Sequence, residues 1–174
     1  MRSLGIALTA ATLIAGSAGA AEITVMMNAV SADGVGASVG MVKLRDTKQG
    51  LFVQPLVGGV TPGAHGFHVH ENGNCGNTAA DGTKGAGLGA AGHYDPKGTK
   101  KHTGPHAADG HAGDLPVLVA DGNGNATLPV LAPNLKTSML KGKAIVIHAG
   151  GDNYADQPAA LGGGGARVAC GLIK

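Results

Sequence analysis

Eight segments of strand length, with no long helical period between them, constrain the fold of this chain more than any other feature. In each segment apolar and polar residues alternate, or Val and Ile dominate, as is typical of β-strands. The expected strands are residues 22–30, 37–45, 51–57, 65–71, 115–120, 126–131, 143–149 and 166–173. The pattern predicts an all-β fold, an eight-stranded antiparallel Greek-key β-barrel or sandwich, with a hairpin turn at residues 121–124.

Two long segments, residues 72–114 and 150–165, interrupt the rhythm of the strands. Both are too long for ordinary hairpin loops, and the first has too little apolar content to be held by burial. Such a segment is disordered, functional or fixed by something other than a core. Because residues 72–114 contain four of the eight histidines and one of the two cysteines, we expect metal ligation and a disulfide to hold this loop.

Histidines at alternate positions of an expected strand form the first candidate metal site. In a strand, His68 and His70 share one face while Phe67 and Val69 occupy the other. Taken alone, the pair fits two ordinary exposed histidines as well as it fits ligands. His148 ends a strand rich in Val and Ile, so it can project inward as another imidazole ligand, although a buried structural histidine is the alternative.

The first long loop adds three imidazoles and one carboxylate, from His93, His102, His111 and Asp114. Three nitrogens and an oxygen make a closed tetrahedral set that suits structural zinc, and the free energy of binding would order a loop without a core. The alternative is a solvated polar loop that binds nothing specific. His65 and His106 fall outside both groups, and we expect them to be structural or exposed.

The N-terminus has the layout of a secretory signal. Arg2 precedes an apolar stretch at residues 4–16 and small residues at 17–21, and cleavage after Ala20 fits best. An anchoring helix is the alternative, but the apolar stretch is short for a bilayer span. We therefore expect one exported domain at residues 21–174, placed in the periplasm, where Cys75 and Cys170 can oxidise to a disulfide.

The charge balance excludes some partners. Thirteen basic and eleven acidic residues leave the chain near neutral, and no basic run is present. Trp is absent, and Phe and Tyr occur twice each, so stacking platforms for nucleic acid are missing. We expect no nucleic-acid partner and no membrane association after signal cleavage, and any attraction of an anion has to come from local charge.

Six motifs, in this order, resemble the signature of the copper/zinc superoxide dismutases, particularly their exported bacterial branch. They are GFHVHENGNC, AGHYDP, KHTGP, GHAGDLP, IHAGGDN and GGGGARVACGLIK. The match spans essentially the whole mature chain, and six motifs with order and spacing preserved are far more specific than a single HxH. The resemblance implies that superoxide is the substrate and that the cofactors are copper and zinc.

Residue by residue, the resemblance implies two ligand sets that share His93. Copper would be held by His68, His70, His93 and His148, and zinc by His93, His102, His111 and Asp114. The implied reaction alternates copper between two oxidation states, releasing oxygen and then hydrogen peroxide. His93 would leave copper and carry a proton in that cycle.

The resemblance also gives roles to residues outside the ligand sets. Arg167 matches the active-site arginine that attracts superoxide, and Asp152 matches an aspartate that accepts hydrogen bonds from two ligand histidines. Cys75 and Cys170 match the family disulfide. Because residues 150–165 lack Lys and Glu, we take Lys84 as a candidate second steering cation.

Other functions fit parts of the sequence. A periplasmic copper or zinc buffer would use the same imidazoles but would not need Arg167 beside an open copper position. An adhesion module stabilised by metal would need an exposed aromatic or apolar stripe, which the sequence does not show. Copper-only relatives are expected to lack the zinc-ligand histidines present here. The sequence leaves open whether the chain is a monomer or a homodimer.

Overall fold

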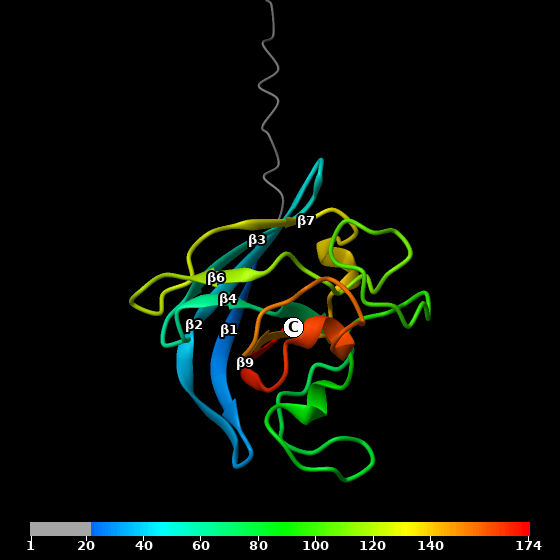
Figure 1. Ribbon diagram of the computed structural model, residues 1–174. Coiled ribbons are helices and arrows are strands. Elements are labelled where there is room, and N and C mark those ends of the chain that lie inside the picture. Colours follow the sequence, from blue (N-terminus) through cyan, green and yellow to red (C-terminus); the bar gives the residue numbers. More distant parts are fainter. Residues whose placement is uncertain (1–21) are drawn as a thin grey trace, which may run out of the picture.

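Antiparallel strands make up most of the regular structure (Figure 1). The computed structural model describes residues 22–174, so the expected signal at residues 1–20 and its cleavage site lie outside the described residues. Within this range the strands are β1 (Glu22–Ser31), β2 (Gly34–Thr47), β3 (Gly50–Val57), β4 (Gly63–His65), β5 (Phe67–His70), β6 (Leu118–Ala120), β7 (Val130–Ala132), β8 (Ala144–His148) and β9 (Arg167–Leu172). Short 3-10 turns lie in the connections: η1 (Leu88–Ala90), η2 (Thr137–Met139) and η3 (Ala160–Gly163). The expected all-β antiparallel fold class is confirmed.

Most strands belong to one curled sheet with the order β5-β8-β9-β1-β2-β3-β7, and β4 pairs with β6 separately. Every pair is antiparallel. The pairing brings together strands that are far apart along the chain, because β5 lies beside β8 and β9 lies beside β1. His70 and His148, which are 78 residues apart in sequence, therefore meet across two neighbouring strands.

The core is aliphatic, as the scarcity of aromatic residues requires. Alternate residues of the long strands enter it, such as Val25 and Met27 from β1 and Val42 and Leu44 from β2. Phe67 is fully buried in the same cluster. Burying one such side chain contributes about 1.5–3 kcal/mol relative to leaving it in water, so the sheet gives the metal ligands a rigid base.

A glycine divides the strand that was expected over residues 65–71. Gly66 N–H donates to Gly150 O (2.7 Å) in the second long loop, and β4 ends before Gly66 while β5 begins after it. A Cβ at Gly66 would lie 3.1 Å from the His68 ring and 3.3 Å from the His148 Cβ. The absence of a side chain here lets the two histidines approach each other.

The turn at residues 121–124 forms, but the expected hairpin around it is wrong. Asp121 Oδ1 accepts hydrogen bonds from the N–H groups of Asn123 and Asn125 (both 2.9 Å), and Gly124 has a φ of 79° that suits glycine. The flanking strands pair elsewhere, β6 with β4 and β7 with β3. Both are also shorter than expected. The turn is fixed by local hydrogen bonds, whereas strand pairing is decided by distant segments.

The disulfide expected from the sequence is present between Cys75 and Cys170, with Cα atoms 5.7 Å apart. It joins the first long loop to β9 across 95 residues of sequence. A small buried cluster surrounds it and includes Val30, Ala90 and Val146. The loop that carries the four candidate zinc ligands is therefore covalently tied to the sheet.

Candidate metal centre

Strand alternation places two histidines on the face opposite the core. Phe67 and Val69 of β5 lie in the hydrophobic core, while His68 and His70 point to the other side, as the sequence predicts. His93 reaches them from the first long loop through a bridge between its backbone and that of His70. His148 at the end of β8 completes the group.

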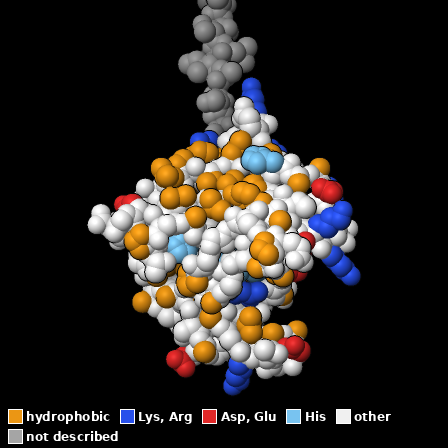
Figure 2. Space-filling view, viewed as in Figure 1, with side chains coloured by type: hydrophobic (Ala, Val, Ile, Leu, Met, Phe, Trp, Pro, Cys, Tyr) orange, Lys and Arg blue, Asp and Glu red, His pale blue; other side chains and the backbone are white. Residues whose placement is uncertain are grey.

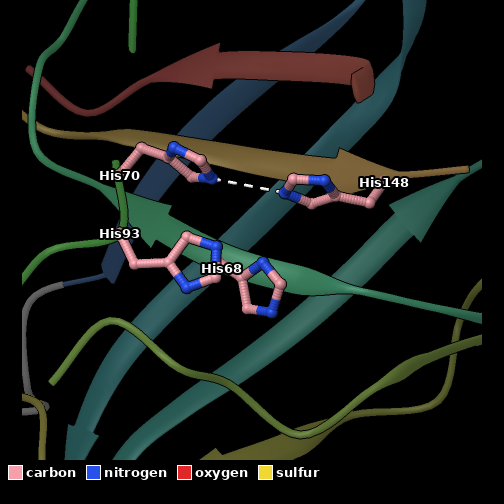
Figure 3. Close-up of side chains that lie close together, drawn as sticks. All are labelled: His68, His70, His93 and His148. Carbon is pink, nitrogen blue, oxygen red and sulfur yellow. Dashed lines mark hydrogen bonds between the residues drawn. The ribbon is translucent and has the colours of Figure 1, made fainter. Parts of the chain in front are cut away.

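The ligand atoms of these four histidines, the copper group, lie within 4.8 Å of one another (Figure 3). His70 Nε2 and His148 Nε2 face each other at 3.3 Å. All four residues are buried. Ring nitrogens that converge in this way, away from water, form a set that can bind one metal ion.

The outward nitrogens of the copper group have hydrogen-bond acceptors. His70 Nδ1–H donates to Ala91 O (2.9 Å), and His148 Nδ1–H donates to Gly165 O (3.1 Å). His68 Nε2–H donates to Asp152 Oδ2 (2.7 Å). These bonds fix each ring and leave the opposite nitrogen free to bind metal. His68 Nδ1 and His93 Nε2 are buried with no hydrogen-bond partner, which fits a metal ion at their meeting point.

A second group gathers around Asp114. The carboxylate oxygens of Asp114 lie 2.9 Å from His93 Nδ1, 3.0 Å from His102 Nδ1 and 3.4 Å from His111 Nδ1. His102 Nδ1, His111 Nδ1 and Asp114 Oδ2 are buried without a hydrogen bond. Three imidazoles and a carboxylate of this kind fit zinc.

A second possible ligand set overlaps with the group around Asp114 but differs from it in one residue. The ligand atoms of His68, His93, His102 and Asp114 all lie within 4.8 Å of one another, so this set contains His68 in place of the expected His111. His68 has only one free nitrogen, Nδ1, because Nε2 is bonded to Asp152. His68 can therefore serve only one of the two sets.

Burial and hydrogen bonds set the charges of the cluster. Burial is the main cause that lowers the pKa of His68 to about 3 and the pKa of His148 to about 4, so both rings are neutral and able to bind metal. Burial opposes the ionised form of Asp114, but the neighbouring rings of His102 and His93 lower its pKa. Burial also opposes the charged form of His102, yet the adjacent carboxylates of Asp114 and Asp152 raise its pKa to about 9. The carboxylates thus favour a cation at this end.

A cavity of about 370 Å³ opens beside the copper group and is lined in part by His70, His93, His148 and Arg167. Arg167 begins β9 and is half-buried; its Nη1 donates to Gly87 O (2.6 Å) and its Nη2 donates to Ala91 O. A permanent positive charge is therefore held beside the imidazoles, where it attracts an anion.

The other predicted cation lies elsewhere. Lys84 is exposed and does not line the cavity; its backbone pairs with Thr78 within the first long loop. On the face drawn in Figure 2, Lys and Arg side chains are scattered and do not form one patch. Of these two cations, only Arg167 lines the cavity beside the copper group.

Asp152 lies between the two ligand groups. Its Oδ2 accepts a hydrogen bond from His68 Nε2 (2.7 Å), and its Oδ1 accepts one from His102 Nε2 (2.8 Å). His65 is structural, since its two ring nitrogens lie 2.7 Å from His148 O and Thr61 O, and His106 is exposed.

Sequence reasoning missed two residues that hold the site together. The carbonyl of Ala91 accepts hydrogen bonds from both His70 and Arg167, and Ala91 has a left-handed φ of 61°. Asp156 Oδ2 accepts a hydrogen bond from the backbone N–H of His102 (3.0 Å). Nothing in the sequence marks Ala91, because its role rests on a backbone atom. Asp156 could have been suspected from its place in the glycine-rich second loop.

A larger cavity, of about 590 Å³, lies between β1, β9 and the disulfide. Lys174 is the one charged residue in its lining, so this cavity has no metal ligands to offer. Among residues 22–174, no helix is long and apolar enough to span a membrane.

Comparisons with known proteins agree on one family. Residues 38–173 match the family model described as copper/zinc superoxide dismutase. The chain is 51% identical over 155 residues to a Cu-Zn superoxide dismutase of Photobacterium leiognathi, covering 89% of this chain and 88% of that protein. It is 46% identical to the Cu-Zn superoxide dismutase of Escherichia coli over 100% of both chains. Among solved structures, the Cu/Zn superoxide dismutase from Brucella abortus superposes with a TM-score of 0.85 at 45% identity, covering 88% of this chain and 100% of that one.

Proposed function

The chain belongs to the copper/zinc superoxide dismutase family, and from this premise we propose how its own residues hold the two metals and act on superoxide. The reaction converts superoxide to oxygen and hydrogen peroxide. When bound, copper supplies alternating one-electron reduction and oxidation, and zinc has a structural role. The side chains of the protein hold the metals, bind the anion and carry a proton.

Copper would be held by the inward nitrogens of His68, His70, His93 and His148, and zinc by His93, His102, His111 and Asp114. The observation that carries this assignment is that the outward nitrogens of three copper-group histidines are occupied by hydrogen bonds, while the inward nitrogens of His68 and His93 lie buried without partners. A buried polar atom without a partner costs free energy unless a ligand satisfies it.

His93 connects the two sets. Its Nδ1 faces Asp114 at 2.9 Å, while its Nε2 lies buried on the side of the copper group. One ring can therefore serve both metals. His93 Nε2 is also the atom at which this side chain holds a proton when it is free of copper, and the adjoining cavity gives that proton a route to the substrate.

Arg167 binds and orients the anion. The guanidinium is fixed by the carbonyls of Gly87 and Ala91, so its position relative to His70 does not depend on a flexible side chain alone. Hydrogen bonds to a charged partner are stronger than neutral ones. Asp152 supports the arrangement from behind by orienting His68 and His102 together.

A metal buffer is the second candidate function, since it would use the same imidazoles. The half-buried Arg167 in the cavity favours the enzyme, because storage of a metal cation gains nothing from a nearby positive charge. Salt dependence of the dismutation rate tests this choice. Arg167→Gln should keep copper bound but lower the rate by about tenfold or more and flatten its salt dependence.

Lys84→Gln in the same experiment tests the second steering cation. We expect the Lys84 variant to lose less rate than the Arg167 variant and to show a weaker salt dependence than wild type, because Lys84 is exposed and lies outside the cavity lining. Lys48→Gln, at another exposed position, is the control. A Lys84 variant that behaves like this control would show that Lys84 does not steer the substrate. An Arg167 variant with the full dismutation rate would favour the metal buffer.

The chain acts in the periplasm after its signal is removed. The layout of residues 1–20 supports this, together with the similarity to bacterial relatives. Mass spectrometry of the exported protein should give Ala21 as the first residue.

Each proposed copper ligand comes from one chain, so a single chain suffices for the reaction whether or not it forms a homodimer. Sedimentation velocity decides between the monomer and the homodimer.

A further inference from the structure

The walls of the copper cavity carry almost no charge. Besides the histidines and Arg167, the lining consists of Ala86, Leu88, Ala160, Leu161, Gly165 and Ala166. These residues come from both long loops. An anion that enters therefore meets one permanent positive charge, held behind apolar side chains.

The backbone conformation of Leu161 is unfavourable for a leucine. Its backbone is left-handed (φ 54°, ψ 44°), a conformation that is unfavourable for a residue with a branched side chain by about 1–2 kcal/mol. Leu161 is 42% exposed and does not belong to either hydrophobic cluster. Neither burial nor backbone preference explains a leucine here, so its position in the cavity wall is the feature that needs explanation.

The second long loop fixes Leu161 against the metal centre. Gly162 N–H donates to Ala155 O (3.0 Å), and Asn153 N–H donates to Gly162 O (3.0 Å). Asp152, in the same loop, is bonded to His68 and His102. The leucine is thus placed by the same segment that orients the ligand histidines.

Leu88 is fixed relative to Arg167. It is the first residue of η1, and the carbonyls of Gly87 and Ala91, which flank this turn, both accept hydrogen bonds from the guanidinium. Leu88 is half-buried and lines the cavity together with Leu161. Two leucines from two loops therefore stand in the wall of one cavity.

We propose that Leu88 and Leu161 form an apolar collar that admits small anions to Arg167 and the copper group and holds back larger, multiply charged ones. The proposal rests on the proposed function and adds its selectivity. Arg167 attracts any anion, so charge alone does not discriminate among them. Apolar side chains cannot replace the hydrogen bonds between an ion and its hydration water. The free-energy cost of losing that water is therefore high for a large, multiply charged ion and lower for a small, singly charged one.

Two probes of different size test the collar on the copper- and zinc-loaded protein. Azide is a small anion whose dissociation constant is read from the visible absorption of copper(II). Hexacyanoferrate(II) is a bulky anion that gives one electron to bound copper(II) and becomes hexacyanoferrate(III), and the loss of the same band gives its rate. Leu161→Gly and Leu88→Ala should raise the hexacyanoferrate rate about tenfold, while the azide constant changes far less.

Leu161→Gly suits the left-handed backbone, so this variant should stay folded, which its melting temperature checks. Leu128→Ala is the control, because Leu128 is 62% exposed and lies outside the cavity lining. If both probes change equally, or neither changes although the copper(II) band is normal, the collar is wrong and the proposed function stands. A wild-type protein without that band would overturn both.

Discussion

Replacing Asp152 by Asn tests how the two metal groups depend on each other. Both carboxylate oxygens are used, Oδ2 by His68 Nε2 at 2.7 Å and Oδ1 by His102 Nε2 at 2.8 Å. An asparagine has the same shape but only one acceptor oxygen. Its NH2 group would face one of the two ring N–H groups, so one of these hydrogen bonds is lost and a donor faces a donor.

The size of the effect depends on the bond that is lost. A hydrogen bond to a charged group contributes about 1.5–3 kcal/mol, which corresponds to a factor of about 10–100 in a binding constant. Loss of a partner that orients a ligand histidine has a similar effect on metal affinity. Because His102 belongs only to the zinc group, we expect Asp152→Asn to weaken zinc binding by about 10–100-fold.

Competition with a chelating dye measures zinc affinity directly, with copper already bound. Asp156→Asn is a matched control, because Asp156 lies in the same loop but accepts hydrogen bonds only from the backbone N–H groups of His102 and Leu161 and does not bond the His102 ring. We expect the control to change zinc affinity by less than the Asp152 variant. Equal losses in the two variants would mean that loop packing, and not the orientation of the rings, holds the zinc ligands.

Two further predictions concern stability. Asp46→Asn should lower the free energy of unfolding at pH 7 by about 1 kcal/mol, because Asp46 accepts hydrogen bonds from Thr137 N–H and Oγ1–H, both 2.8 Å. The backbone hydrogen bond from Thr137 lowers the pKa of Asp46 below its ordinary value of 3.8. The difference in unfolding free energy between wild type and variant should therefore persist above that pH and decrease as the pH falls below it. Urea titrations in which this difference does not decrease at low pH would refute the role of Asp46. Replacing Cys75 and Cys170 together by Ser should cost about 4.7 kcal/mol in the chain-entropy account, because the disulfide closes a loop of 95 residues. An unchanged melting temperature of the metal-free protein would contradict this prediction.

Local patterns predicted most of the fold. Each of the expected strands at residues 22–30, 37–45 and 51–57 appears with ends that differ by only a few residues. These strands are long, and their alternation is set by burial on one face. The weaker segments at 115–120 and 126–131 are reduced to β6 and β7, because their partners β4 and β3 are chosen by topology and leave only short stretches paired.

The candidate ligands could be identified in the sequence from their chemistry and not from a strand pattern. Imidazole and carboxylate groups are the chemistry that metals need, so His93 and Asp114 could be identified as residue types without knowing the fold. The sequence could not reveal the contribution of the backbone. The carbonyl of Ala91, shared by His70 and Arg167, and the left-handed Leu161 in the cavity wall depend on loop conformations that no residue pattern encodes.

The most direct test of the proposed function is the superoxide dismutation rate of the mature chain, stripped of metal and reloaded with copper and zinc, beside His148→Ala treated in the same way. We predict that the reloaded wild type reaches a rate near the diffusion limit, as is established for superoxide dismutases, that the metal-free protein is inactive, and that His148→Ala loses most of the rate because one of the four converging imidazoles is gone. Tight copper and zinc binding without a copper-dependent rate would contradict the proposed function and make the metal buffer the better description.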